Sequence, residues 1–282
     1  HASWCPAGAW GFAMKRTAFI LLSFLTLLLP SCSTVPITGR QQLSLVSSST
    51  LNSMSFQQYR EFLSQHKIVR GTADAALVGK VGRRIQGAVE NYCRANNLSS
   101  RLDGYQWEFN LVDDPEVNAW CMPGGKVVVY TGILPVTRDE AGLATVIGHE
   151  VAHAVANHGN ERMSQSLLVN MGGITLGTAL STQPAATQNL FSALYGIGSQ
   201  VGLMLPYSRL HESEADHLGL IFMAMAGYDP NGAIPFMDRL KAADKNAAAP
   251  QFLSTHPADS ARINAMRQAI PEAMQYYKKP KP

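Results

Sequence analysis

Two histidines and a glutamate fall at a spacing that could hold a metal ion and use it. His149 and His153 are four residues apart, and Glu150 directly follows the first of them. On a helix, residues four apart project from one face, so both imidazoles could reach the same ion. Zinc accepts imidazole ligands readily, and Glu150 could turn toward a water molecule at the metal as its general base. The pattern therefore predicts metal-assisted hydrolysis.

The residues around this motif predict a buried helix. Most of its neighbours are apolar: Ala144, Val146, Ile147, Val151, Ala152 and Val155. A surface helix with two solvated histidines is the alternative, and the apolar surroundings disfavour it because buried imidazoles need polar partners. We expect Thr137 or Asp139 to cap the helix, which should run to about His158 and end at Gly159.

A catalytic zinc site needs a third protein ligand and an open fourth position. The metzincin pattern would place a glycine and a histidine at set distances after the second histidine. Those positions hold Ala156 and Gly159, and His158 is one residue out of register. The metzincin arrangement is therefore excluded.

The better source of a third ligand is the segment 211–219. Glu212 would bind the metal, and Asp216, one helical turn further on, would hydrogen-bond a ligand histidine and fix its tautomer. Glu214 points elsewhere on this helix and is expected to be solvated. The histidines His66, His158, His211 and His217 are expected to be structural or exposed to solvent.

Taken together, these segments resemble the gluzincin zinc metallopeptidases of family forty-eight, and most of all the periplasmic lipoprotein-type members. Two flanking stretches add to the resemblance: the Asn-Ala segment 118–126, and the Thr-His-Pro segment 255–257 followed by Arg262-Ile263. The similarity covers roughly residues 34–270. The resemblance implies one Zn2+ per chain, held by His149, His153 and Glu212. It also implies an α+β fold, a mainly helical zincin-type metallopeptidase domain with a small β-sheet beside a two-helix zinc site.

The resemblance assigns roles to three further residues. Asn118 and Ala119 match the family's edge strand, which receives the substrate backbone by strand addition; the alternative is a core hairpin. His256 matches a histidine near the zinc, where it could stabilise the oxyanion of the tetrahedral intermediate. It could instead occupy the open zinc position and hold the enzyme latent, or be a loop histidine that caps a helix.

The order of elements follows from periodicity and turn residues. We expect helices over 50–65, 73–96 and 208–226, and strands over 105–112, 117–120 and 127–130. The apolar, glycine-rich segment 164–206 should form two helices that pack over the cleft or rest on a membrane surface, with a membrane-spanning hairpin as the alternative.

The N-terminal part resembles a bacterial lipoprotein precursor. An apolar run after Lys15-Arg16 ends in Leu29-Pro30-Ser31-Cys32, so Cys32 would carry lipid and anchor the protein. The alternative is an ordinary signal with an incidental cysteine. We predict these divisions: 1–13 upstream extension, 14–31 lipoprotein signal peptide, 32–49 tether, 50–270 zinc metallopeptidase domain and 271–282 tail, of which 278–282 should be loose.

Charge and cysteine content bound the function further. The net charge of +3 includes no basic block, so nucleic-acid binding is not expected. Cys93 and Cys121 could form a disulfide in an oxidising periplasm or remain free, because sequence alone does not give their separation.

These observations predict a zinc-dependent endopeptidase of the bacterial cell envelope, lipid-anchored on the periplasmic face of the outer membrane. It would hydrolyse misfolded or unassembled envelope proteins. One rival is a chaperone-like outer-membrane assembly lipoprotein with a latent zinc site. The other is a zinc-binding lipoprotein without catalysis, which the intact Glu150 disfavours. The oligomeric state is not decided by the sequence.

Overall fold

The computed structural model describes residues 32–171, 187–191, 207–243 and 251–278. The predicted upstream extension and signal peptide lie outside these residues. So does most of the helical pair predicted over 164–206, of which helix α6 (His158–Met171) and residues 187–191 are described.

A four-stranded sheet forms one layer of the fold, with strands in the order β3-β4-β6-β5. Its strands are β3 (Ile68–Val69), β4 (Glu108–Val112), β5 (Ala119–Met122) and β6 (Lys126–Tyr130). β4 and β6 are parallel and the other pairs antiparallel, so β5 lies at an edge with Ala119 opposite Val129. Gly124 and Gly125, both at positive φ, make the turn that joins β5 to β6.

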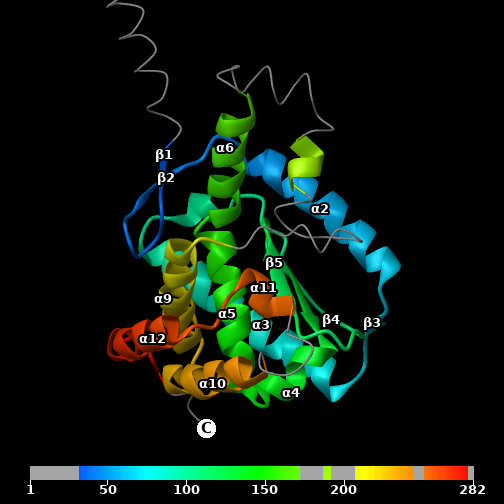
Figure 1. The fold of residues 1–282 in the computed structure, drawn as a ribbon, viewed down its shortest axis with the longest axis vertical. Coiled ribbons are helices and arrows are strands. Elements are labelled where there is room, and N and C mark those ends of the chain that lie inside the picture. Colours follow the sequence, from blue (N-terminus) through cyan, green and yellow to red (C-terminus); the bar gives the residue numbers. More distant parts are fainter. Residues whose placement is uncertain (1–31, 172–186, 192–206, 244–250, 279–282) are drawn as a thin grey trace, which may run out of the picture.

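Helices cover both faces of this sheet (Figure 1). Helix α2 (Ser48–Gln65) packs Tyr59 and Phe62 against Trp120 and Tyr130 of the sheet. On the other face lie α3 (Ala73–Ala95) and α5 (Glu140–Val155). Behind α5 pack α9 (Arg209–Met225), α10 (Ala233–Ala243) and α12 (Ser260–Ala273).

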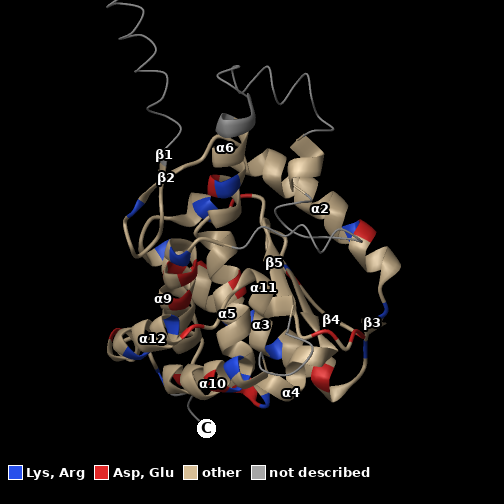
Figure 2. Cartoon of the chain, in the orientation of Figure 1, with Lys and Arg blue, Asp and Glu red and all other residues tan. Residues whose placement is uncertain are grey.

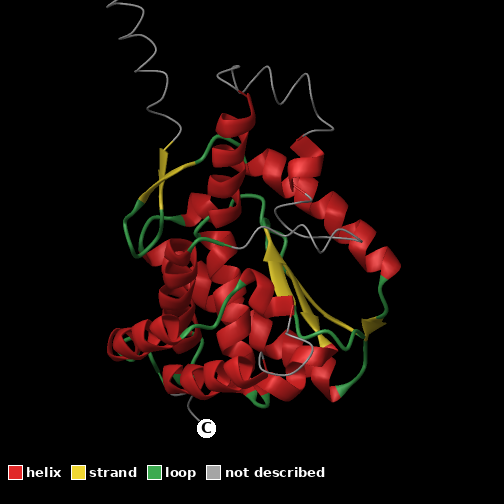
Figure 3. Cartoon of the chain, viewed as in Figure 1, coloured by secondary structure: helices red, strands yellow, loops and turns green. Residues whose placement is uncertain are grey.

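Short elements connect these layers. Figure 3 distinguishes helices, strands and loops by colour. The connecting elements are η2 (Ser99–Leu102), η3 (Thr131–Ile133), α4 (Leu134–Thr137), η5 (Pro230–Gly232) and α11 (Gln251–Thr255). The mainly helical α+β fold class is confirmed, and α3 and β6 lie within a residue of their predicted ranges.

The crossing of α5 and α9 is unusually close. A Cβ built on Gly148 would lie 3.0 Å from the carbonyl oxygen of Gly219, and one on Gly219 would lie 3.0 Å from the backbone nitrogen of His149. Because neither glycine carries a side chain, the two backbones meet directly. The contact brings the face of α9 that carries Glu212 against the face of α5 that carries the two histidines.

The range 32–49 is folded, so its predicted role as a tether is wrong. β1 (Cys32–Thr34) and β2 (Gln41–Leu43) form a hairpin, which we call the N-terminal hairpin, and α2 begins at Ser48. Buried Val35 and the ion pairs of Arg40 with Glu161 and Glu214 hold the hairpin against the domain. Cys32 is the first described residue, and its lipidation stays a prediction.

Charged residues of both signs are distributed over the described part of the chain. Figure 2 shows acidic and basic positions interspersed along its helices, strands and loops. Within the described residues, no helix combines the length and the apolar character that crossing a bilayer requires. The predicted tail begins inside α12, which continues to the buried Ala273.

Candidate metal centre

Helix α5 positions the two histidines and the glutamate of the motif. Its N-terminus is capped by Asp139, whose side chain accepts from the N–H of Gly142 at 2.7 Å. His149 and His153 lie one turn apart, with their Nε2 atoms 3.1 Å from each other. Both imidazoles are buried, as the apolar surroundings of the motif predict.

Helix α9 brings Glu212 to the same point. Its carboxylate oxygens lie 3.3 Å from Nε2 of His153 and 3.5 Å from Nε2 of His149. His256, which follows α11, places Nδ1 2.8 Å from Glu212 and 3.2 Å from His149. One ligand atom from each of these four residues lies within 4.8 Å of every other.

This donor set fits a zinc ion. Ligand atoms around a tetrahedral zinc with bonds of roughly 2.0–2.1 Å are about 3.3 Å apart. The three predicted ligands match that spacing at 3.1, 3.3 and 3.5 Å. Two imidazole nitrogens and a carboxylate that converge in a buried site lack enough protons to satisfy one another, whereas a cation would satisfy them all.

Glu150 lies beside this set and is itself buried. Its Oε1 has no hydrogen-bond partner and lies 3.5 Å from Nε2 of His256. Burial raises the pKa of the Glu150 carboxyl, while the charges of His256 and His149 and the backbone N–H of Cys121 act in the opposite direction. A carboxylate with a raised pKa is suited to accept and return a proton.

Asp216 lies beside His149, and an arginine binds Asp216. Asp216 Oδ1 lies 2.9 Å from Nδ1 of His149, and Arg262 donates to both Asp216 oxygens at 2.6 and 2.7 Å. The same guanidinium lies 2.5 Å from Glu212. Sequence reasoning missed this role, although Arg262 stands six residues after His256 in the matched segment.

Two differences from the sequence expectations concern the residues behind His153. Helix α5 ends at Val155, and the left-handed Asn157 (φ 64°) breaks the chain before α6 begins at His158. Glu214, predicted to be solvated, is buried and bonded to His158 and Arg40. Burial alone would raise the pKa of Glu214, but these hydrogen bonds lower it to about 2.

The other predicted site residues lie as follows. Asn118 is buried just before edge strand β5, and its side chain accepts from the N–H of Ala119 at 2.9 Å. Cys93 and Cys121 are both buried and free, so the disulfide is absent; one thiol lies late on α3 and the other on β5. His211 is buried, and His217 pairs with Glu272 at 2.9 Å.

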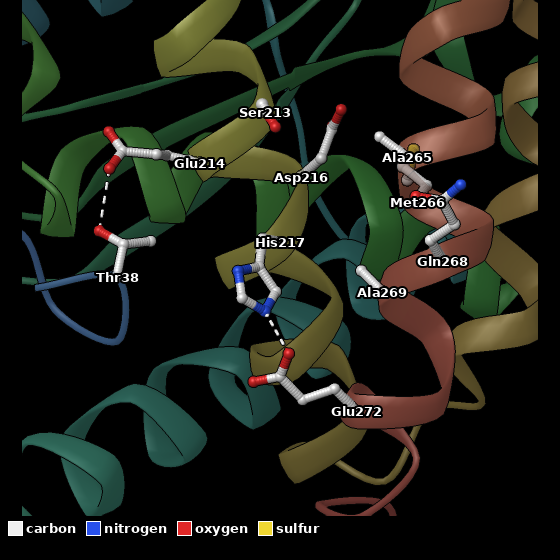
Figure 4. Close-up of a pocket in the computed structure, with 10 residues that line it drawn as sticks. All are labelled: Thr38, Ser213, Glu214, Asp216, His217, Ala265, Met266, Gln268, Ala269 and Glu272. Carbon is white, nitrogen blue, oxygen red and sulfur yellow. Dashed lines mark hydrogen bonds and ion pairs between the residues drawn. The ribbon is translucent and has the colours of Figure 1, made fainter. Parts of the chain in front are cut away.

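Two cavities border the α9 side of the centre. One of about 290 Å³ includes Glu212, Tyr207 and Arg262. The other, of about 340 Å³, lies between α9 and α12 and is drawn in Figure 4. In that view Glu214 turns toward Thr38 and His217 toward Glu272, while Asp216 leaves α9 in another direction.

Comparisons with known proteins agree with the geometry. The model of the family described as peptidase family M48 matches residues 80–270. Mitochondrial metalloendopeptidase OMA1 of Schizosaccharomyces pombe is 34% identical over 243 residues, which cover 85% of this chain and 66% of the relative. The OMA1 of Saccharomyces cerevisiae is 37% identical, over 64% of this chain and 51% of the relative.

A bacterial relative matches less of the chain. The beta-barrel assembly-enhancing protease of Escherichia coli is 29% identical over 60% of this chain and 36% of its own length. The chain thus spans between about a third and two thirds of the length of these three relatives. The predicted location in a bacterial cell envelope is wrong on this comparison, because the relatives matched with higher identity are mitochondrial proteins.

Proposed function

The chain belongs to peptidase family M48, and we propose that it acts as a zinc-dependent endopeptidase whose metal is held by His149, His153 and Glu212. One observation carries the proposal: these three ligand atoms lie 3.1–3.5 Å apart in a buried cluster, next to the carboxylate of Glu150. Neither a metal store nor a structural zinc site needs a buried carboxylate beside its ligands, whereas hydrolysis needs a base there.

The residues of the chain divide the reaction between them. Bound zinc supplies a Lewis acid that polarises the scissile carbonyl and makes a water molecule more acidic. Glu150 takes the proton from the attacking water and then donates it to the leaving amine. Asp216 and Arg262 keep His149 in the tautomer that presents Nε2 to the metal.

Unfolded or unassembled proteins are the proposed substrates. Strand β5 lies at the sheet edge and packs beside α5, the helix that carries Glu150. An edge strand can bind an extended peptide through main-chain groups, with little demand on sequence. Extended segments free for such pairing are common in unfolded chains and scarce in folded ones, so this geometry supports a quality-control role. Asn118 and Ala119 would lie at the start of the binding strand.

A second candidate is a latent form of the same centre, with a substrate-binding role that does not depend on cleavage. It is favoured by His256, whose Nδ1 lies 2.8 Å from Glu212 and 3.2 Å from His149, where a fourth ligand would be. Rings of Phe252 and Tyr207 stack on His256 and hold it there. Replacing His256 by Ala distinguishes the two roles: casein cleavage rises if His256 blocks the centre and falls if it stabilises the oxyanion.

Digestion of casein by the purified protein tests the proposal. Wild type should cleave casein with zinc and stop when a chelator is added. Glu150→Gln should retain zinc and lose activity by a factor of about 10² or more. Endopeptidase activity that persists in Glu150→Gln would refute the role of Glu150 as the base. Activity that is unchanged by the chelator would refute the zinc dependence. A wild type that binds zinc and cleaves nothing would favour the latent form.

A further inference from the structure

A second histidine lies directly behind the zinc ligand His153. His153 turns Nε2 toward the other ligands, and its Nδ1 lies 3.0 Å from Nδ1 of His158. His158 is completely buried, so no solvent water could replace it as a partner. The proposed hydrolysis does not use this ring, and its placement therefore needs another reason.

The break between α5 and α6 creates this contact. On a continuous helix, residues five apart lie about 140° apart around the axis and face different sides. Asn157 adopts φ 64° between the two helices, so the chain turns before His158 and the two rings meet. Asn tolerates the left-handed conformation better than most residues do.

The direction of each hydrogen bond follows from the metal. Since His153 must present an unprotonated Nε2 to zinc, its Nδ1 carries the proton and donates to Nδ1 of His158. His158 must then carry its own proton on Nε2, which lies 3.2 Å from Oε2 of Glu214. Glu214 accepts it as a carboxylate, and no other assignment of protons satisfies all three groups.

The N-terminal hairpin fixes the far end of this chain of contacts. Thr38 donates to Glu214 at 2.9 Å (Figure 4), and Nε of Arg40 donates to the same carboxylate at 2.9 Å. The turn that carries them includes Ile37 at φ 65°, a conformation that β-branched residues rarely adopt. Ile37 nevertheless packs against the core, which holds the turn in place.

We infer that His158 is a positioning residue for the zinc ligand His153, and that the N-terminal hairpin holds it in the required tautomer through Thr38, Arg40 and Glu214. The inference rests on the proposed zinc function. It gives both ligand histidines the same kind of support. A carboxylate and an arginine, Asp216 and Arg262, lie directly behind His149. Behind His153, a carboxylate and an arginine also follow, but the ring of His158 lies between them and the ligand.

A pair of matched variants tests the inference. His158→Phe keeps a ring of similar size and removes the acceptor. The control is His211→Phe: His211 is also buried, stacks on His158 with ring centroids 4.5 Å apart and binds Glu161, but does not contact His153. Competition with a zinc-binding dye should show zinc affinity reduced about 10- to 100-fold in His158→Phe and unchanged in His211→Phe.

A second pair covers the case in which His158→Phe fails to fold. Glu214→Gln and Glu161→Gln each remove one negative charge from the carboxylates that bind Arg40, but Glu214 alone contacts His158. Glu214→Gln should weaken zinc binding about 10-fold or more and alter the visible spectrum of the cobalt-substituted protein, while Glu161→Gln should do neither. Melting of the metal-free proteins should show similar losses within each pair.

The possible outcomes separate this inference from the proposed function. Equal zinc affinity in wild type, His158→Phe and Glu214→Gln would overturn the positioning role and leave the zinc peptidase intact. Equal losses of zinc affinity in the two members of each pair would also overturn it, because the effect would then be a general loss of stability. A wild type that binds no zinc would refute the proposed function itself.

Discussion

At the scale of single residues, this centre depends on groups that do not touch the metal. Asp216 holds His149, and Arg262 holds both Asp216 and Glu212. Burial alone would raise the pKa of Asp216, but the charge of Arg262 and the hydrogen bonds from Arg262 and His149 lower it. The carboxylate therefore stays charged, with Oδ1 2.9 Å from Nδ1 of His149.

Replacing Asp216 by Asn should weaken zinc binding about 10- to 100-fold. The amide is neutral, and its NH2 group would face an N–H donor of either Arg262 or His149 in place of an acceptor oxygen. Zinc affinity of the purified variant measures the effect. Asp238→Asn is the control, since that carboxylate is 56% exposed and pairs only loosely with Arg267 at 3.8 Å. An Asp216→Asn protein that binds zinc as tightly as Asp238→Asn would contradict the role given to Asp216.

The sequence alone pointed to the proposed metal ligands more clearly than to the groups that lie behind them. His149 and His153 stand four residues apart on one helix, and Glu212 and Asp216 stand four apart on another. The structure brings His149, His153 and Glu212 together. Arg262, His158 and Glu214 are distant in sequence from the atoms that they support, or lie beyond a helix break. No periodic pattern marks such contacts, because they depend on how whole helices cross.

At the scale of elements, the crossing of α5 and α9 decides whether the ligands meet. Its position depends on Gly148 and Gly219, since each lets the other helix approach to backbone contact. The sequence predicted both helices. Their close approach could not be predicted, because a glycine inside a helix can also lower helix stability without making any close contact with another helix.

Gly219→Ala should destabilise the protein by about 1–3 kcal/mol. The new methyl group would lie 3.0–3.1 Å from backbone atoms of Gly148 and His149, which cannot move without separating the helices. Urea unfolding of the metal-free protein measures the change. We expect zinc affinity to fall as well, because Glu212 would move away from the histidines.

Gly87→Ala is the matched control for that experiment. Gly87 is also inside a helix, α3, but a Cβ there would meet nothing within 4 Å. Alanine should therefore stabilise the protein by about 0.5–1 kcal/mol through its higher helix propensity. If both substitutions shift stability in the same direction, the close crossing is not the constraint that we describe.

At the scale of the whole molecule, the metal centre joins elements from most of the chain. Its ligands and their supports come from α5, α6, α9, the segment after α11 and the N-terminal hairpin. The mainly helical α+β class was predicted from the resemblance to family forty-eight, together with the periodicity of the individual helices and strands. The hairpin was predicted to be a tether because its Ser, Thr, Pro and Gly residues are typical of loops.

Removal of zinc should lower the melting temperature of wild type, since a ligand that binds only the folded state stabilises it by mass action. Scanning calorimetry with and without a chelator measures the shift. His153→Ala, which lacks a ligand, should melt at the same temperature in both conditions. If the melting temperature of wild type is the same with and without the chelator, the helices that carry the proposed ligands are not held together by a metal ion.

The position of α2 has a practical consequence for expression in the laboratory. The segment recognised by the family comparison starts at residue 80, yet α2 and the N-terminal hairpin precede it. A recombinant fragment trimmed to that start would uncover Trp120 and Tyr130 on one face of the sheet and remove the guanidinium beside Glu214. Such a fragment should precipitate, and a cloning boundary placed before Cys32 should restore its solubility.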